Sequence, residues 1–153
     1  AQCSYDPRWV RDVVGGRAYE HPALPIFYGL KLDELDTPKA YALYEQGSAI
    51  NYLGKGDPPA IMFYSEPKAP LKPGPNTGLR VYYDGFGKRI EGQDDPGWGI
   101  HHINFGYALR EKMGPLGIAC LVRHADDYQA QGNGENGANA EFVEFLQKNF
   151  GTN

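Results

Sequence analysis

Three of the four histidines stand where an imidazole could act as a general base. His101 and His102 come together before a segment with a helical pattern, and His124 follows an apolar run. A neutral imidazole near pH 7 can take a proton from an attacking hydroxyl group. Glu66, just past another apolar run, is the nearest carboxylate that could orient such a base. These four side chains are the candidate catalytic residues.

His102 is placed first among them because a glycine-rich lead-in, residues 97–99, lets the backbone bring it close to Glu66. Each candidate also has a structural interpretation. Histidines at a helix start suit capping or packing, His124 suits hydrogen bonding at the end of a strand, and Glu66 suits a solvated loop. The sequence leaves both interpretations open.

Aromatic side chains in the long segment 66–99 form a second candidate for function. Trp98, Tyr82 and Phe86 are the candidate substrate-binding residues, because aromatic faces suit a sugar ring or an acyl chain. Packing of the segment onto the rest of the chain is the other interpretation. A glycine turn at 84–87 between two apolar runs predicts a β-hairpin here. A connection of this length usually covers a site or makes an interface.

Two short apolar runs, residues 60–64 and 118–122, are predicted to be β-strands. Between them, the apolar spacing over 103–113 predicts a helix. A strand, a helix and a strand in this order form a unit with parallel strands. Parallel strands normally lie buried in sheets of several strands, and the chain offers only this pair outside the segment 66–99. We therefore expect an α/β fold whose sheet is incomplete, with two open edges.

Capping residues and apolar spacing predict the remaining elements. Thr37-Pro38, for example, is a typical helix start. The predicted elements are a helix opened by Asp6-Pro7, an irregular connection over 18–30, a helix over 38–47 with a short turn to Tyr52, a polar loop over 129–138, and a last helix over 140–150 with Phe142, Leu146 and Phe150 on its apolar face.

Composition excludes some classes of protein. With 41% hydrophobic and 22% charged residues, the 153-residue chain is typical of globular rather than disordered proteins. The net charge of −4, without a basic run, argues against a nucleic-acid partner. No apolar stretch approaches the roughly 18–20 residues that span a bilayer, so no membrane partner is predicted. The two cysteines, Cys3 and Cys120, do not fix the redox compartment.

Two acidic pairs, Asp94-Asp95 and Asp126-Asp127, raise the question of a metal site. Carboxylates near imidazoles suit several divalent ions. The spacing matches no calcium-binding loop of the EF-hand type, and solvated loop charges explain the pairs better. No metal and no cofactor is therefore predicted.

The order strand, acid-bearing turn, crossover helix, strand and terminal helix resembles the end of an α/β-hydrolase. Residues 57–64 resemble the strand that precedes the triad acid in that family, and residues 99–118 resemble the helix and strand that follow it. Residues 5–8 and 21–25 resemble segments found just after the nucleophile half. The likeness is to esterase/lipase-like hydrolases of environmental bacteria, and it covers nearly all of the chain.

The resemblance implies that residues 1–153 are a single C-terminal segment of such a hydrolase, with 66–99 as an insertion. The implied fold is a partial α/β-hydrolase, namely the last parallel strands with crossover and terminal helices and a hairpin-containing insertion. An absent N-terminal half would supply the serine and the oxyanion hole for acyl transfer from a carboxylic ester. The expected partners are that half or a second copy of the chain, and a small-molecule ester.

The catalytic pattern of that family is incomplete in this chain. The nucleophile motif G-x-S-x-G is absent, since residues 47–49 (Gly-Ser-Ala) lack the second glycine. Lys68 stands where the family acid is expected, and Tyr128 stands near the family's histidine position. We therefore predict that the chain alone does not hydrolyse esters. The alternative function is a non-catalytic hydrolase-like module that uses the aromatic insertion for binding or assembly.

Overall fold

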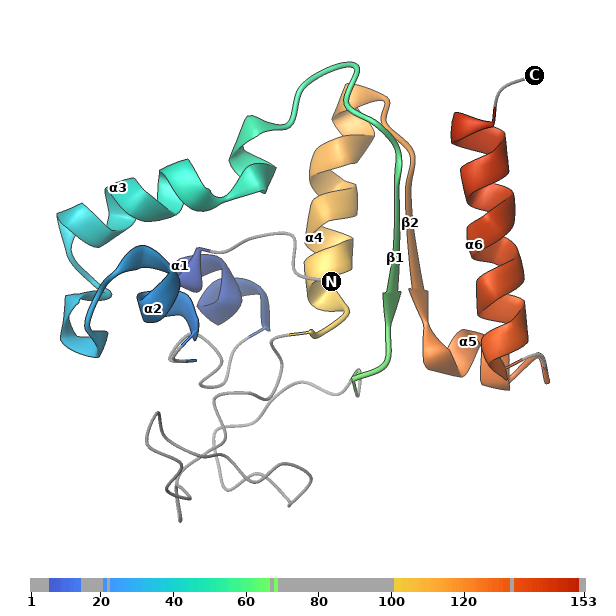
Figure 1. Ribbon diagram of the computed structural model, residues 1–153, viewed down its shortest axis with the longest axis horizontal. Coiled ribbons are helices and arrows are strands. Elements are labelled where there is room, and N and C mark those ends of the chain that lie inside the picture. The colour runs from blue at the N-terminus through green and yellow to red at the C-terminus, as the bar shows by residue number, and fades with distance from the viewer. Residues whose placement is uncertain are drawn as a thin grey trace, which may run out of the picture.

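A small parallel sheet lies between helices in the computed structural model, which describes residues 6–14, 21, 23–66, 68, 101–132 and 134–151. Strands β1 (Ala60–Tyr64) and β2 (Cys120–His124) pair in parallel, and they are the two strands among the described residues. Helix α4 (Asn104–Met113) lies on one side of the pair and α6 (Gly134–Phe150) on the other (Figure 1). The predicted strand–helix–strand order and the coarse α/β class are confirmed.

Strand β2 begins two residues later than the apolar run 118–122 predicts. Ala60 pairs with Cys120, and the Ala60 N–H donates to the Ala119 carbonyl at 2.9 Å. The strand then continues to His124, which pairs with the last residue of β1. The bounds predicted from apolar character were therefore wrong for β2, because the strand ends with two polar residues, Arg123 and His124, that pair with β1.

One face of the sheet is buried beneath α4. Met62, Tyr64 and Val122 point to this face and are buried. A Cβ at Gly106 of α4 would lie 2.7 Å from both the Tyr64 ring and a Val122 methyl group. The absent side chain of Gly106 therefore lets the helix approach the strands closely. The core that results comprises Val14, Leu24, Met62, Tyr64, Ile103, Phe105 and Val122.

The chain after β2 is more helical than predicted. A short helix, α5 (Ala125–Gln129), follows the strand directly, and α6 begins at Gly134. The predicted polar loop over 129–138 is therefore wrong over much of its length. Glycines at positions 134 and 137 disfavour a helix locally, but packing of α6 against α5 outweighs that preference.

The apolar face predicted for the last helix is also not its buried face. Phe145 is 6% exposed, whereas Phe142, Leu146 and Phe150 are all exposed. The helix thus buries one aromatic ring and leaves an apolar stripe uncovered among the described residues. None of the described helices combines the length and apolar character needed to cross a membrane.

The first helix begins as predicted at Asp6, whose Oδ1 accepts the N–H of Arg8 at 2.9 Å. Helix α1 (Pro7–Trp9) continues as a π-helical turn over Val10–Val14. The predicted helix over 38–47 is confirmed as α3 (Pro38–Gly47), followed by a 3₁₀ turn over Ala49–Tyr52.

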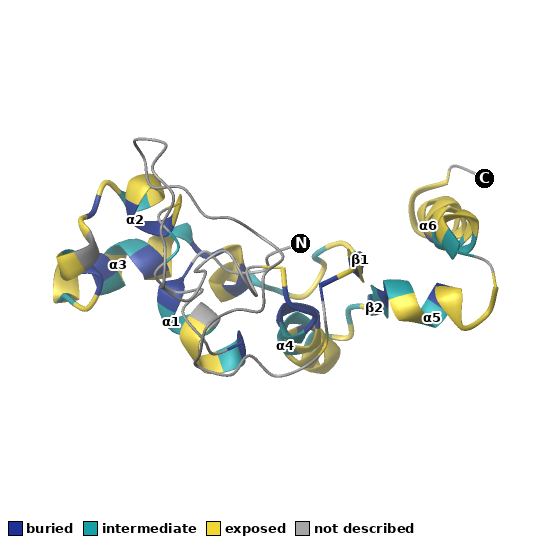
Figure 2. Cartoon of the chain, turned by 90° about the horizontal axis from the view of Figure 1, so that it is seen from below, coloured by how far each residue is buried: buried dark blue, intermediate teal, exposed yellow. Residues whose placement is uncertain are grey.

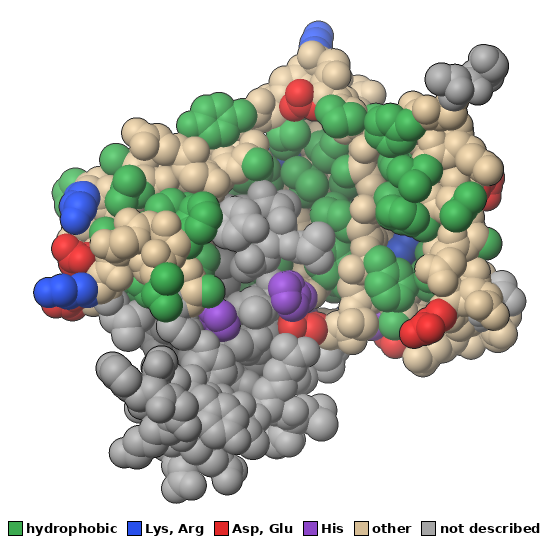
Figure 3. All heavy atoms as spheres, in the orientation of Figure 1, with side chains coloured by type: hydrophobic (Ala, Val, Ile, Leu, Met, Phe, Trp, Pro, Cys, Tyr) green, Lys and Arg blue, Asp and Glu red, His purple; other side chains and the backbone are tan. Residues whose placement is uncertain are grey.

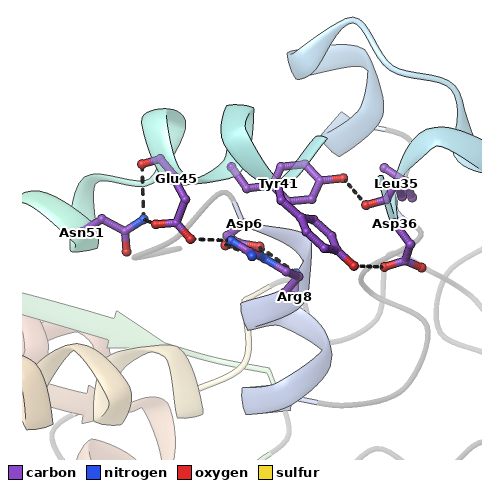
Figure 4. Close-up of polar contacts among 8 residues, drawn as sticks. Asp6, Arg8, Leu35, Asp36, Tyr41, Glu45 and Asn51 are labelled. Atoms are coloured by element: carbon purple, nitrogen blue, oxygen red, sulfur yellow. Dashed lines mark hydrogen bonds and ion pairs between the residues drawn. The ribbon is translucent and has the colours of Figure 1, made fainter. Parts of the chain in front are cut away.

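An ion-pair network fastens α1 to α3 (Figure 4). Arg8 Nη2 lies 2.6 Å from Asp6 Oδ2 and 2.7 Å from Glu45 Oε1 of α3. The same guanidinium lies over the Tyr41 ring, 4.7 Å from its centre. Asp6 is buried, so these contacts replace the water that its carboxylate loses on folding.

A helix also forms where an irregular connection was predicted over 18–30. Helix α2 (Ala23–Tyr28) tolerates Pro25 because the proline falls in the first turn, where N–H groups have no partner within the helix. The Nδ1 of His21 accepts the N–H of Ala23 at 3.1 Å and caps the helix start. Figure 2 shows α2 and α3 at the end of the molecule farthest from α6.

Candidate functional site

The carboxyl ends of β1 and β2 meet at one edge of the sheet, because Tyr64 and His124 are the last residues paired. Glu66 and Lys68 follow β1, and α5 follows β2. In open parallel sheets, ligands bind outside the carboxyl ends of the strands. This edge is therefore the place to look for a functional site.

His124 uses both ring nitrogens within this edge. Its Nδ1 accepts the N–H of Asp126 at 3.1 Å, so in the neutral ring the proton is assigned to Nε2. The Nε2–H then donates to the main-chain oxygen of Glu66, 2.7 Å away. His124 thus caps α5 and ties the end of β2 to the chain leaving β1. These contacts match the structural interpretation of this histidine.

The acidic pair after β2 is also engaged. Asp127 Oδ2 accepts the N–H of His124 at 2.8 Å, and Lys68 Nζ lies 3.3 Å from Asp127 Oδ1 and 3.6 Å from Asp126 Oδ2. The His124 N–H, and then Lys68, hold the pKa of Asp127 below its ordinary value. Within the described ranges, no three His, Cys, Asp or Glu side chains gather as a metal site requires.

His102 is buried at the start of α4, with 2% of its surface exposed. Its Nδ1 accepts the N–H of Asn104 at 3.2 Å, which again assigns the proton to Nε2. That Nε2 has no hydrogen-bond partner among the residues that the structure describes. A buried donor without an acceptor costs about 1–3 kcal/mol, so it calls for an explanation.

The remaining predicted site residues fall into two groups. His101 is exposed, and Glu66 is buried with its main-chain oxygen held by His124. Trp98, Tyr82 and Phe86, like the predicted hairpin, lie outside the described residues. Of the predicted site residues, the structure thus joins Glu66 and His124, through the main-chain oxygen of Glu66.

A polar cluster on the α6 side of the sheet was not predicted. Arg123 of β2 makes a two-pronged contact with Glu141 of α6, at 2.9 Å from Nε and 2.6 Å from Nη2 to Oε1. The Tyr128 hydroxyl also donates to Glu141. Burial, followed by this contact, raises the pKa of Tyr128 to about 12. Only the pairing register reveals that Arg123 points toward α6, so the sequence carried no clear signal of the cluster.

An apolar groove runs between β1 and α6. It has a volume of about 450 Å³, and its lining includes Ile61 and Phe63 of β1 with Ala138 and Phe142 of α6. Figure 3 shows hydrophobic side chains gathered over this part of the molecule. Cys120 of β2 carries a free thiol, and burial raises its pKa.

Comparison with protein-family models, with curated proteins and with solved structures gives no match to this chain. A functional proposal therefore depends on the geometry at the carboxyl end of the sheet and along the groove.

Proposed function

We propose that this chain is the C-terminal segment of a carboxylic-ester hydrolase of the α/β-hydrolase type that acts by serine acyl transfer. The observation that carries the proposal is the buried His102, whose Nε2 lacks a partner among the described residues, at the start of the helix that joins two parallel strands. A parallel pair with helices on both sides supports the same class of fold. The serine and the oxyanion hole belong to a part of the protein beyond this chain.

Each step of the proposed reaction moves one proton to or from a histidine. The serine hydroxyl attacks the ester carbonyl while a histidine takes its proton, and the alcohol then leaves with a proton from that histidine. Water attacks the acyl-serine in the same way and releases the acid. His102 is proposed as this histidine, with Glu66 as the acid that orients it.

The hydrogen bond at Asn104 sets a condition on this role. A base must present an unprotonated Nε2 to the serine, whereas acceptance of the Asn104 N–H at Nδ1 puts the proton on Nε2. His102 must therefore give up that hydrogen bond to act as a base. With the bond intact, the Nε2–H suits donation to a carbonyl oxygen that gains negative charge.

The test is to read the gene on the 5′ side of the Ala1 codon and to assay the full-length product on 4-nitrophenyl acetate. The proposal expects G-x-S-x-G upstream, turnover that a serine-directed phosphonate abolishes, and no turnover by residues 1–153 alone. A full-length product without that motif and without turnover contradicts the proposal. Turnover by residues 1–153 alone would contradict the assignment of the serine to another part.

A second function is favoured by the exposed groove between β1 and α6. A non-catalytic hydrolase-like module would use such a surface, together with the aromatic insertion, for binding or assembly. The same assay separates the two functions, because this module would bind its partner and show no turnover.

A further inference from the structure

The groove between β1 and α6 combines apolar walls with a polar end. Ile61, Ala138 and Phe142 line it with apolar surface, and Glu135 and Asn139 add polar groups nearer the start of α6. The four α6 residues follow the spacing i, i+3, i+4 and i+7, so they share one face of the helix. Because Glu135 and Phe142 are seven positions apart, about 10 Å separates them along the helix axis. The volume of about 450 Å³ falls in the range of small-molecule sites.

The charges along this groove are not balanced. Arg123 and Glu135 are the charged side chains among its described lining residues. Arg123 Nη2 already lies 2.6 Å from Glu141 Oε1, which neutralises the guanidinium. The Glu135 side chain is exposed and makes no ion pair or hydrogen bond within the described part of the chain. The groove therefore offers a ligand one negative charge that the protein itself leaves unpaired.

The polar end of the groove lies at the carboxyl edge of the sheet. Phe63 and Arg123, both in the lining, form the pair next to the last one in the ladder. Helix α6 begins beside the ends of the strands and runs antiparallel to them (Figure 1). Glu135 in its first turn therefore lies at the edge where ligands of open parallel sheets bind. From there the groove leads along α6 to Phe142.

We propose that this groove binds a small arylalkyl primary amine. Its ring would pack between Phe63 and Phe142, and its ammonium group would lie within reach of Glu135. An ammonium group only donates hydrogen bonds, which suits the Glu135 carboxylate and the amide oxygen of Asn139. A ligand carboxylate would meet the like charge of Glu135 instead. The site does not involve His102 or a serine, so the inference goes beyond the proposed ester hydrolysis.

The apolar contact should supply most of the affinity. Phe63 is 46% exposed and Phe142 is 48% exposed, so both rings have surface left to bury against a ligand. An ion pair at an exposed carboxylate strengthens binding by at most about fivefold. The positive end of the α6 dipole lies near Glu135 and reduces that gain. The charge therefore decides which ligand is preferred, and the apolar walls decide how tightly it binds.

The probe is 4-phenylbutylamine, with 4-phenylbutanol and 4-phenylbutyrate as its neutral and anionic analogues. Each is titrated into the chain near neutral pH and at low ionic strength, while methyl signals are followed by NMR. The methyl signals of Ile61 and Ala138 should shift, and those of Val122, which contacts α4 on the opposite face of the sheet, should not.

The order of affinities tests the charge. The amine should bind about two- to fivefold more tightly than the alcohol, and the carboxylate should bind least tightly. Added salt should reduce the difference between amine and alcohol. Equal affinities, or tightest binding of the carboxylate, overturn recognition of an amine. Binding of the amine without shifts at Ile61 and Ala138, or no binding of any probe, overturns the site.

Two matched pairs of variants test the two ends of the groove. Glu135→Gln should remove the preference for the amine over the alcohol, whereas Glu144→Gln, at an exposed carboxylate outside the lining, should keep it. Phe142→Ser should weaken binding of all three probes about tenfold, whereas Val143→Ser, also exposed and outside the lining, should not. Equal results within a pair overturn the role of that end. If Phe142→Ser fails to fold, the order of the three probes on the native chain decides.

Self-association has its own readout. Shifts of the Ile61 methyl signals that grow with protein concentration, without any probe, would show that a second copy fills the groove and would overturn the stated ligand. None of these measurements involves ester turnover. Failure of the hydrolase proposal and failure of the amine site are therefore distinguishable.

Discussion

The Nε2 of His124 lies 2.7 Å from the main-chain oxygen of Glu66, so one side chain joins the ends of two strands whose residues are 58 positions apart. The same ring accepts the Asp126 N–H at the start of α5. His124, which the sequence suggests as a base, therefore links the end of β2 to the start of α5 and to the chain that leaves β1.

His124→Phe should destabilise the chain by about 1–3 kcal/mol, because it replaces the imidazole with a ring that cannot make the hydrogen bonds to the Glu66 carbonyl and the Asp126 N–H. Urea unfolding followed by circular dichroism measures the difference. The control is His101→Phe, at an exposed position, which should change stability by less than about 0.5 kcal/mol. Equal effects of the two substitutions would contradict the joining role of His124.

His102→Asn and His102→Ala separate capping from the role of Nε2. Asparagine can keep an acceptor for the Asn104 N–H while removing the imidazole ring, so it should destabilise the chain less than alanine does. Alanine removes the acceptor and should cost about 0.5–2 kcal/mol for the cap alone. If asparagine destabilises as much as alanine, Nε2 has a structural partner. In the full-length protein, His102→Asn should lower kcat by about 10²–10⁴ if the ring is the base.

Gly106→Ala should destabilise the chain by about 1–3 kcal/mol, since the new Cβ would overlap the Tyr64 ring and a Val122 methyl group. The control is Gly114→Ala, where no atom lies within 4 Å and the backbone is already helical. That substitution should leave stability unchanged or raise it by about 0.4–1 kcal/mol. Similar melting temperatures for the two variants would contradict close packing of α4 on the sheet.

Acid should weaken the attachment of α6 to the sheet. Hydrogen bonds from Arg123, and then from Tyr128, hold the pKa of Glu141 below its ordinary value of 4.5. A lowered pKa in the folded state contributes stability above the unfolded pKa, and that stability is lost as pH falls through the folded value. Unfolding free energy should therefore fall below about pH 5 more steeply in the native chain than in Glu141→Gln.

Glu144→Gln, an exposed carboxylate on the same helix, is the control for this pH series. It should keep the acid sensitivity of the native chain, because it leaves the Arg123–Glu141 pair in place. A Glu141→Gln profile that follows the native profile at every pH would show that the pair does not contribute to the acid response.

Local signals placed several elements correctly. Thr37-Pro38 marks the start of α3 because the Thr37 hydroxyl accepts the Ala40 N–H at 3.2 Å, a contact that needs only neighbouring residues. The apolar run 60–64 marks β1 for a similar reason, since its alternate residues must be buried. The boundaries of β2 and α6 were wrong because pairing to Ala60 and packing on α5 decide them.

The sequence by itself determined the strand–helix–strand order, the capped helix starts and the histidines worth considering as a base. Tertiary structure decided that His124 bonds to the Glu66 carbonyl, because the two groups meet only when β1 and β2 lie in register. It also decided that the His124 N–H, on the outer edge of β2, donates to Asp127 at the start of α5. Hydrogen bonds of this kind join residues brought together by the sheet, so no local pattern encodes them.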